Sequence, residues 1–218
     1  MIKLVVLDWD DCITRGSSEG YYACYTAAIK HLGVEKDPDE IRTKVRELWG
    51  RPHRDVIASI VGDKNPLLNS ISEYYEQCIF TNTFSAALEL IPGADEKLRE
   101  LKETYQLAIA TGMNGTLLRE QILPRFNMEG IFSTIASSSE LPDPSRGKPY
   151  PDLLLKILKE LTILPEEAVM VGDAKGDVLM AQAAKVQPIV VLTGQLTEEE
   201  AKDLGAETII PDITYLDI

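Results

Sequence analysis

The chain has 218 residues and a formal net charge of −13, and its length fits one large globular domain or a core with a smaller attached domain. This charge repels nucleic-acid backbones and anionic membranes, and no run rich in Lys and Arg offsets it locally, so we expect neither as a partner. The sequence lacks an apolar run of the roughly 20 residues that span a bilayer, and its first residues lack the features of a signal peptide. We therefore expect a cytoplasmic protein.

The chain begins with a predicted buried strand and continues with predicted helices. Residues 2–7 form a short run rich in β-branched side chains that ends at a cluster of acidic residues, which is typical of a strand in a parallel sheet. Helical patterns follow at residues 21–32 and 38–49, the second ending at Gly50, and a third begins at Pro66. No strand pattern interrupts this helical stretch.

After Pro92 and Gly93 the predicted elements alternate between helices and strands to the end of the chain. The predicted strands are 106–110, 131–136, 168–171, 188–192 and 208–210, and the helices are a segment through Leu98 and Leu101, then 116–126, 152–161, 177–184 and 198–204. This alternation predicts an α/β fold with a Rossmann-like, doubly wound parallel sheet. We expect residues 1–15 and 90–218 to form this core, with residues 16–89 inserted as an all-helical cap domain.

Polar residues that could carry chemistry follow the predicted strands or precede the next helix. Ligands in an open α/β sheet bind beyond the carboxyl ends of the strands, so side chains at these positions should converge. Taken singly, each group is more simply a turn or a helix cap. Their order along the chain favours a shared site, and the groups are Asp8 with Asp10, Thr111 with Gly112, Lys148 with Pro149, and Asp173 with Asp177.

These groups resemble the four signature motifs of the haloacid dehalogenase superfamily, and the resemblance covers nearly the whole chain. A helical insertion just after the first motif is similar to the helical-cap subgroup, which includes phosphoglycolate phosphatase and β-phosphoglucomutase. The resemblance implies a Rossmann-like core and a reaction through an aspartyl phosphate. Dehalogenases of the superfamily carry a non-acidic residue two positions after the nucleophile, so Asp10 favours phosphoryl transfer.

The acidic residues of these motifs predict a magnesium site. Carboxylates of Asp8, Asp10, Asp173 and Asp177 would repel one another in a shared crevice, so we expect a cation between them. Oxygen ligands of this kind suit Mg²⁺, which also binds substrate phosphate. The metal would supply the positive charge that this acidic protein needs in order to bind a small phosphorylated metabolite.

The same motifs predict a role for each catalytic residue. We expect Asp8 to attack phosphorus as the nucleophile and Asp10 to act as general acid and then as general base. Thr111 and the backbone near Gly112 would bind phosphate oxygens, while Lys148 would neutralise charge on Asp8 and on the transferring group.

Two segments bear on substrate choice. Asp11 and Cys12 stand where the superfamily commonly has glycine and threonine; aspartate tolerates the left-handed backbone conformation, and Cys12 is best interpreted as a small packing residue. The basic segment from Gly50 to Asp55 is predicted to be a turn between two helices. Its Arg51 or Arg54 could contact a second anionic group of the substrate, and a simple solvated turn has nearly equal weight.

Three alternatives remain open at this point. A sugar-phosphate mutase would use the same aspartyl phosphate but return the phosphoryl group to its substrate. A protein of this superfamily could also bind a phosphoester or a partner without turnover, although the presence of four residues argues against this: Asp8, Asp10, Lys148 and Asp173. A phospho-acceptor signalling module would need a different order of acidic residues. We expect a monomer or a homodimer.

Overall fold

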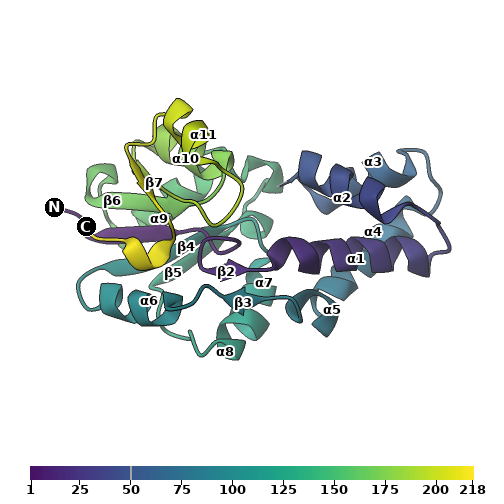
Figure 1. Ribbon diagram of the computed structural model, residues 1–218, viewed down its shortest axis with the longest axis horizontal. Helices are drawn as coiled ribbons and strands as arrows, with labels where there is room; N and C mark the ends of the chain where they lie inside the picture. Colours follow the sequence, from purple (N-terminus) through teal and green to yellow (C-terminus); the bar gives the residue numbers. More distant parts are fainter. Residues whose placement is uncertain (50) are drawn as a thin grey trace. The chain divides into compact units, whose positions relative to one another are not determined.

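The computed structural model describes residues 1–49 and 51–218 (Figure 1). The chain divides into two compact units. The core unit consists of Met1–Arg15 and Glu89–Ile218, and the helical unit is Gly16–Leu88. The predicted core and cap have nearly the same limits, with residue 89 assigned to the other part.

The core unit contains a six-stranded sheet in which every pair of neighbouring strands is parallel. The strand order is β5-β4-β1-β6-β7-β8. The strands are β1 (Leu4–Leu7), β4 (Gln106–Thr111), β5 (Thr134–Ser137), β6 (Ala168–Gly172), β7 (Gln187–Val191) and β8 (Thr208–Ile210). This confirms the predicted doubly wound α/β fold.

Strand β1 lies at the centre of the sheet and determines where the functional edge is. All four of its residues are fully buried, as its apolar, β-branched sequence predicts. Leu7 pairs with Ile109 of β4 on one side and with Val171 of β6 on the other. The chain adds β4 and β5 on one side of β1 and β6 to β8 on the other, so the order reverses beside β1, where α/β sheets bind ligands.

Helices cover both faces of this sheet (Figure 1). They are α6 (Ala94–Lys102), α7 (Gly115–Leu117), α8 (Leu123–Arg125), α9 (Asp152–Leu161), α10 (Lys175–Ala184) and α11 (Glu198–Asp203). One buried cluster joins Leu4 and Val6 of β1 to Leu153 of α9 and Met180 of α10. The predicted helix 116–126 is instead α7, a π-helical turn at Leu118–Ile122, and α8.

A short antiparallel pair, β2 (Thr14–Arg15) with β3 (Glu89–Leu90), joins the two segments that lead into and out of the helical unit. Arg15 and Glu89 also form an ion pair of 2.7 Å. These strands were not predicted, because two residues are too few for an alternating pattern to be recognised. The pair holds the two connections together, and thus defines where the insertion begins and ends.

The helical unit contains α1 (Ser17–His31), α2 (Pro38–Glu47), α3 (His53–Val61), α4 (Leu68–Ile79) and α5 (Asn82–Ser85). Helix α1 packs on α4 and α5, and Tyr25 of α1 stacks on Tyr75 of α4 with ring centroids 4.3 Å apart. The predicted turn up to Asp55 is wrong from His53 onward, because α3 starts there and places Arg54 in its first turn. The predicted helix end at Gly50 lies outside the described residues.

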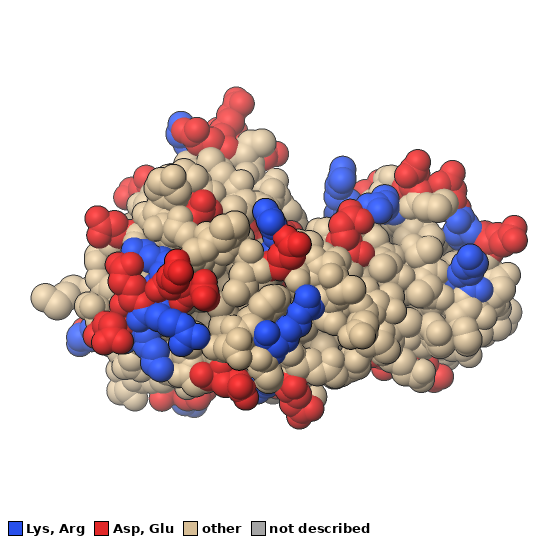
Figure 2. All heavy atoms as spheres, turned by 60° about the horizontal axis from the view of Figure 1, so that its bottom comes forward, with Lys and Arg blue, Asp and Glu red and all other residues tan. Residues whose placement is uncertain are grey.

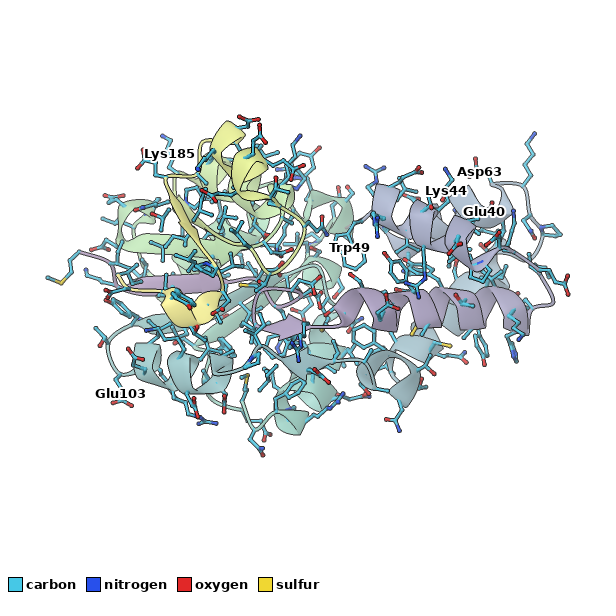
Figure 3. The ribbon with its side chains drawn as sticks, viewed as in Figure 1. Glu40, Lys44, Trp49, Asp63, Glu103 and Lys185 are labelled. Carbon is cyan, nitrogen blue, oxygen red and sulfur yellow. The ribbon has the colours of Figure 1, made fainter. Side chains whose placement is uncertain are left out.

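Charged side chains are spread over the surface of the molecule. Figure 2 shows Lys and Arg interspersed with Asp and Glu on one face. In Figure 3, Glu103 and Lys185 point outward from the core unit, and both residues are exposed. Among the helices that residues 1–49 and 51–218 form, none is both long and apolar enough to cross a membrane.

Candidate active site

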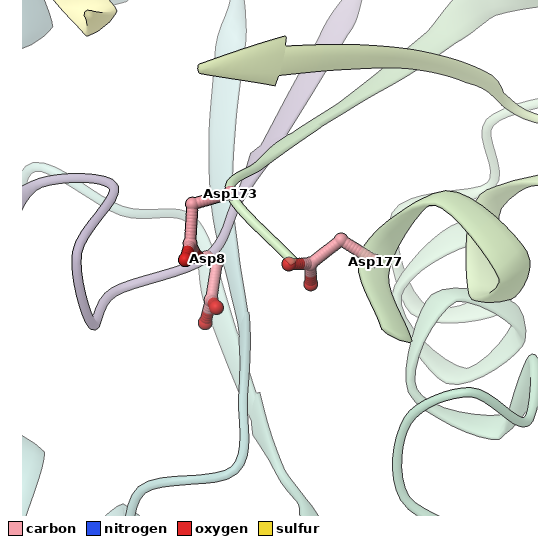
Figure 4. Close-up of side chains that lie close together, drawn as sticks. All are labelled: Asp8, Asp173 and Asp177. Carbon is pink, nitrogen blue, oxygen red and sulfur yellow. The ribbon is translucent and has the colours of Figure 1, made fainter. Parts of the chain in front are cut away.

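Three buried carboxylates converge at the carboxyl end of the central strands (Figure 4). Asp8 directly follows β1, Asp173 directly follows β6, and Asp177 lies in the first turn of α10. Each of them offers an oxygen within 4.8 Å of the others. Their exposed fractions are 8%, 2% and 2%, respectively, so solvent contributes little to the stabilisation of their charge.

Lys148 lies among these carboxylates and contacts two of them. Its Nζ atom is 2.7 Å from Oδ1 of Asp8 and 2.6 Å from Oδ1 of Asp177. The Lys148 side chain is 14% exposed, so its ammonium group is largely shielded from water. This position agrees with the predicted pairing of Lys148 with Asp8, although its second ion pair with Asp177 was not anticipated.

The electrostatics of the cluster show that one lysine does not balance it. Burial raises the pKa of Asp8 to about 7; Lys148 acts to lower it, while Asp177 and Asp10 raise it further. Burial, followed by the charges of Asp177 and Asp8, raises the pKa of Asp173 well above its usual value. Burial also acts to lower the pKa of Lys148, but attraction to Asp177 and Asp8 outweighs it and raises that pKa.

These residues fit a divalent cation. Three ionised carboxylates and one ammonium group leave a formal charge of −2, which one divalent ion would balance. Carboxylate oxygens are the ligands that hard cations such as Mg²⁺ and Ca²⁺ prefer. Each carboxylate already has a partner in the protein, since Lys148 pairs with Asp8 and Asp177 and the Gln195 amide donates to Asp173 at 3.0 Å. Each also keeps acceptor capacity for a cation, so all three are candidate ligands.

The turn after Asp8 has a residue in the left-handed backbone conformation, and this residue is Asp11 instead of a glycine. Asp11 has a φ of 55°, the left-handed region that glycine most readily adopts and aspartate tolerates. Cys12 is fully buried, its Sγ lies 3.7 Å from the Val171 carbonyl, and burial raises the pKa of its thiol well above the usual value. Cys12 is therefore a packing residue, as predicted.

Asp10 is partly buried and is not one of the three clustered carboxylates.

A loop after β7 contacts the site, and local sequence patterns did not indicate this contact. The amide of Gln195 donates a hydrogen bond to Oδ2 of Asp173 at 3.0 Å. Gly194 leaves no room for a side chain, because an added Cβ would lie 1.8 Å from the same oxygen. The signal that could have revealed this loop is its place at the end of β7, next to strand β6, which Asp173 directly follows.

Thr111 ends β4, the strand beside β1, and is fully buried. Its Oγ1 accepts a hydrogen bond from the Met113 amide at 3.0 Å, which shapes the turn through Gly112. Ser137, at the end of β5, donates a hydrogen bond of 2.5 Å to the Met113 carbonyl and so supports the same turn. Ser137 was not among the residues predicted from the sequence.

The two candidate arginines belong to the helical unit. Arg51 is exposed, and its guanidinium lies 3.8 Å from the carboxylate of Asp55. Arg54 donates a hydrogen bond of 3.4 Å to the side chain of Asn69. These contacts are local to the helical unit, so substrate binding by either arginine stays a prediction.

Known proteins resemble this chain along almost its whole length. The family model described as haloacid dehalogenase-like hydrolase matches residues 2–185. The phosphoglycolate phosphatase of Nitrosococcus oceani is 25% identical over 217 residues, which cover 97% of this chain and 93% of that protein. The phosphorylated carbohydrates phosphatase of Thermotoga maritima is 27% identical and covers 100% and 98%, respectively.

Solved structures show the same fold. The crystal structure of a haloacid dehalogenase-like hydrolase from Bacteroides fragilis has a TM-score of 0.80 to this chain. Its sequence is 21% identical, and the alignment covers 100% of both chains. At this level of identity the similarity establishes the fold, and the chemistry has to be argued from the residues of the site.

Proposed function

Because the chain belongs to the haloacid dehalogenase-like hydrolases and is a phosphatase, we propose that it hydrolyses phosphate monoesters of small metabolites, with Mg²⁺ as cofactor and Asp8 as nucleophile. The observation that carries this proposal is the buried cluster of Asp8, Asp173 and Asp177 around the ammonium group of Lys148. A cluster of this charge is suited to bind a cation and a phosphate together.

Bound Mg²⁺ would offset the charge of the carboxylates and of the substrate phosphate. Asp8 and Asp173 would hold it, with Asp177 as a further ligand or as a support for Lys148. The lysine also favours the ionised form of Asp8, because its Nζ lies 2.7 Å from that carboxylate. An ionised Asp8 is required for attack on phosphorus.

The reaction then follows from the residues around Asp8. An oxygen of Asp8 forms a bond to phosphorus, the ester P–O bond breaks, and Asp10 donates its proton to the leaving alcohol. In the second step Asp10 removes a proton from water, which attacks phosphorus and releases inorganic phosphate and the Asp8 carboxylate. Thr111 and the amides near Gly112 would bind phosphate oxygens, and Lys148 would balance charge on the transferring group.

We propose that the helical unit acts as the cap that selects the substrate, with Arg51 or Arg54 contacting an anionic group distant from the reacting phosphate. The relatives support small phosphorylated compounds as the substrate class, since one is named for phosphoglycolate and another for phosphorylated carbohydrates. Both classes can carry a second polar or charged group for such an arginine to bind.

The test is release of inorganic phosphate from a panel of phosphoglycolate, sugar phosphates and nucleotides, with Mg²⁺ and with a chelator. We compare the native protein with Asp8→Asn and, as a matched control at an exposed site, Asp203→Asn. We expect turnover that needs Mg²⁺, is lost in Asp8→Asn by more than about 10³-fold, and is unchanged in Asp203→Asn. Brief reaction followed by acid quench should leave phosphate on the native protein in a linkage that hydroxylamine cleaves, as an acyl phosphate requires.

Two results would contradict the proposal. Undiminished turnover in Asp8→Asn would remove Asp8 as the nucleophile. Conversion of one sugar phosphate into its isomer without phosphate release would instead identify a mutase.

A further inference from the structure

The loop after β7, residues 193–196, contacts both strand ends that form the candidate site. On one side, the amide of Gln195 donates to Oδ2 of Asp173, and the amide of Leu196 donates to the carbonyl of Asp173, each at 3.0 Å. On the other side, the hydroxyl of Thr193 donates a hydrogen bond of 2.5 Å to the carbonyl of Asp11. One loop therefore links the turn after β1 to the residue after β6.

We propose that Thr193 is a positioning residue for general acid catalysis, acting through Asp11 on the neighbouring Asp10. This inference rests on the proposed function, because it takes Asp10 as the group that protonates the leaving alcohol. In the part of the chain that the structure describes, the Thr193 hydroxyl donates to the Asp11 carbonyl and not to the nucleophile or to a candidate metal ligand. Its effect is therefore on the geometry of the turn.

The conformation of Asp11 explains why this turn needs a constraint. A residue with a Cβ is disfavoured in the left-handed region, and Asp11 has a φ of 55°. Since the peptide group is planar, a donor that holds the Asp11 carbonyl oxygen also fixes the plane between Asp11 and Cys12. The orientation of the turn, and with it the position of Asp10, then depends on Thr193.

The loop that carries Thr193 is held in place by its close contact with Asp173. Gly194 allows the loop to approach Asp173 so closely that an added Cβ would lie 1.8 Å from Oδ2. The partly buried Thr193 precedes this glycine, and its hydroxyl reaches a residue 182 positions earlier in the sequence. On the other side of the turn, the amides of Ile13 and Thr14 donate to the Trp9 carbonyl at 3.1 and 3.2 Å. The Asp10–Cys12 segment is thus held from both sides.

Two substrates with different leaving groups distinguish a misplaced general acid from a general loss of protein stability. An alkyl phosphate needs protonation of its leaving oxygen, whereas p-nitrophenyl phosphate releases a stable anion and needs it far less. Loss of a correctly placed general acid therefore slows alkyl esters selectively. A variant that merely unfolds or weakens metal binding slows both kinds of ester by the same factor.

The experiment compares Thr193→Val, which removes the hydroxyl and keeps the shape, with Thr193→Ser, which restores the donor. Thr104→Val, at an exposed site, is the matched control. For the best alkyl phosphate of the panel we expect kcat of Thr193→Val to fall about 10-fold or more, with KM nearly unchanged. The loss on p-nitrophenyl phosphate should be several-fold smaller, Thr193→Ser should recover most of the rate, and Thr104→Val should match the native protein.

Equal losses on the two esters, or no loss, from native protein that turns both over, would overturn the role of Thr193 and leave the proposed function intact. If the native protein turns over no ester, the proposed function fails, and with it the stated role in general acid catalysis. Hydrogen exchange then still tests the structural step. The amides of residues 11–14 should exchange faster in Thr193→Val than in the native protein, and unchanged exchange would show that Thr193 does not hold the turn.

Discussion

The two units of the molecule bury polar groups of different kinds. The buried polar side chains of the core unit include the three carboxylates Asp8, Asp173 and Asp177. Among the described residues of the helical unit, the buried polar side chains include the hydroxyls of Ser17 and Ser72, and every carboxylate is exposed. The helical unit keeps its carboxylates at the surface, as in the ion pair of 2.7 Å between Arg42 and Glu19.

This difference separates a unit that holds a cluster of buried charges from a unit that is held together by apolar and aromatic packing. Burying like charges is unfavourable unless cations compensate them, so the core unit gives up stability to hold its carboxylates together. The helical unit packs apolar and aromatic residues instead, including Tyr75, which stacks on both Tyr25 and His53. We therefore expect mutations in the core site to change catalysis most, and mutations on the helical unit to change substrate preference or stability.

The largest effect should come from Lys148→Met, because it removes the ammonium group that pairs with the buried carboxylates of Asp8 and Asp177. Removal of one partner from a buried ion pair costs about 3 kcal/mol or more, so the free energy of unfolding in urea should fall by roughly this amount. Phosphate release should also be lost. The control is Lys202→Met, which removes an ion pair that is well exposed on α11 and should leave stability and turnover unchanged.

The stability of Lys148→Met measured with added Mg²⁺ tests whether repulsion among the carboxylates causes the loss. If the carboxylates destabilise the fold through their repulsion, Mg²⁺ should recover part of the stability that Lys148→Met loses, because it binds the folded state. Equal stability of Lys148→Met and the native protein without metal would mean that Lys148 does not compensate the cluster.

A smaller effect, on substrate binding alone, is expected from Arg54→Ala in the helical unit. One charged hydrogen bond to a distal anionic group would contribute about 1.5 kcal/mol, so KM for a substrate with such a group should rise roughly tenfold at nearly constant kcat. The measurement compares a substrate that carries a second anionic group with one that lacks it. Arg42→Ala, at the pair with Glu19, is the matched control; a change in kcat without a change in KM would assign Arg54 another role.

The smallest effect concerns the pH dependence of stability. Burial lowers the pKa of His53 below 6.5, against the opposing charges of Glu76 and Asp55. The folded state thus binds fewer protons at His53 than the unfolded state. The contribution of neutral His53 to stability is complete above pH 6.5 and is lost as the pH falls from 6.5 through the lowered pKa.

The variant His53→Gln isolates this contribution, because all other titrating groups are common to both proteins. Urea unfolding at pH 7.5 and 5.5 should give a native protein that loses more stability on acidification, or gains less, than His53→Gln. An identical pH dependence in the two proteins would mean that His53 titrates normally in the fold.

Much of the architecture could be predicted from local sequence patterns. The buried strand β1 and the amphipathic helix α9 have periodic apolar residues, and their predicted limits agree with the structure to within a few residues. The predictions were weakest where local patterns are short or ambiguous. The pair β2 and β3 has two residues in each strand, and the start of α3 at His53 lies between Pro52 and the charged Arg54, in a segment whose composition also suits a turn.

The sequence by itself determined which residues stand at strand ends, because an apolar run and the polar residues that directly follow it can be recognised within a short segment. It thereby identified Asp8, Thr111 and Asp173 at strand ends, and Lys148 before the next helix, as candidates. Only the tertiary structure decided which of these groups touch. Lys148 bridges Asp8 and Asp177, and Thr193 reaches Asp11 across 182 positions, because the order of the strands brings distant loops to one edge of the sheet. Such contacts depend on strand order and on the path of each loop, which no local pattern encodes.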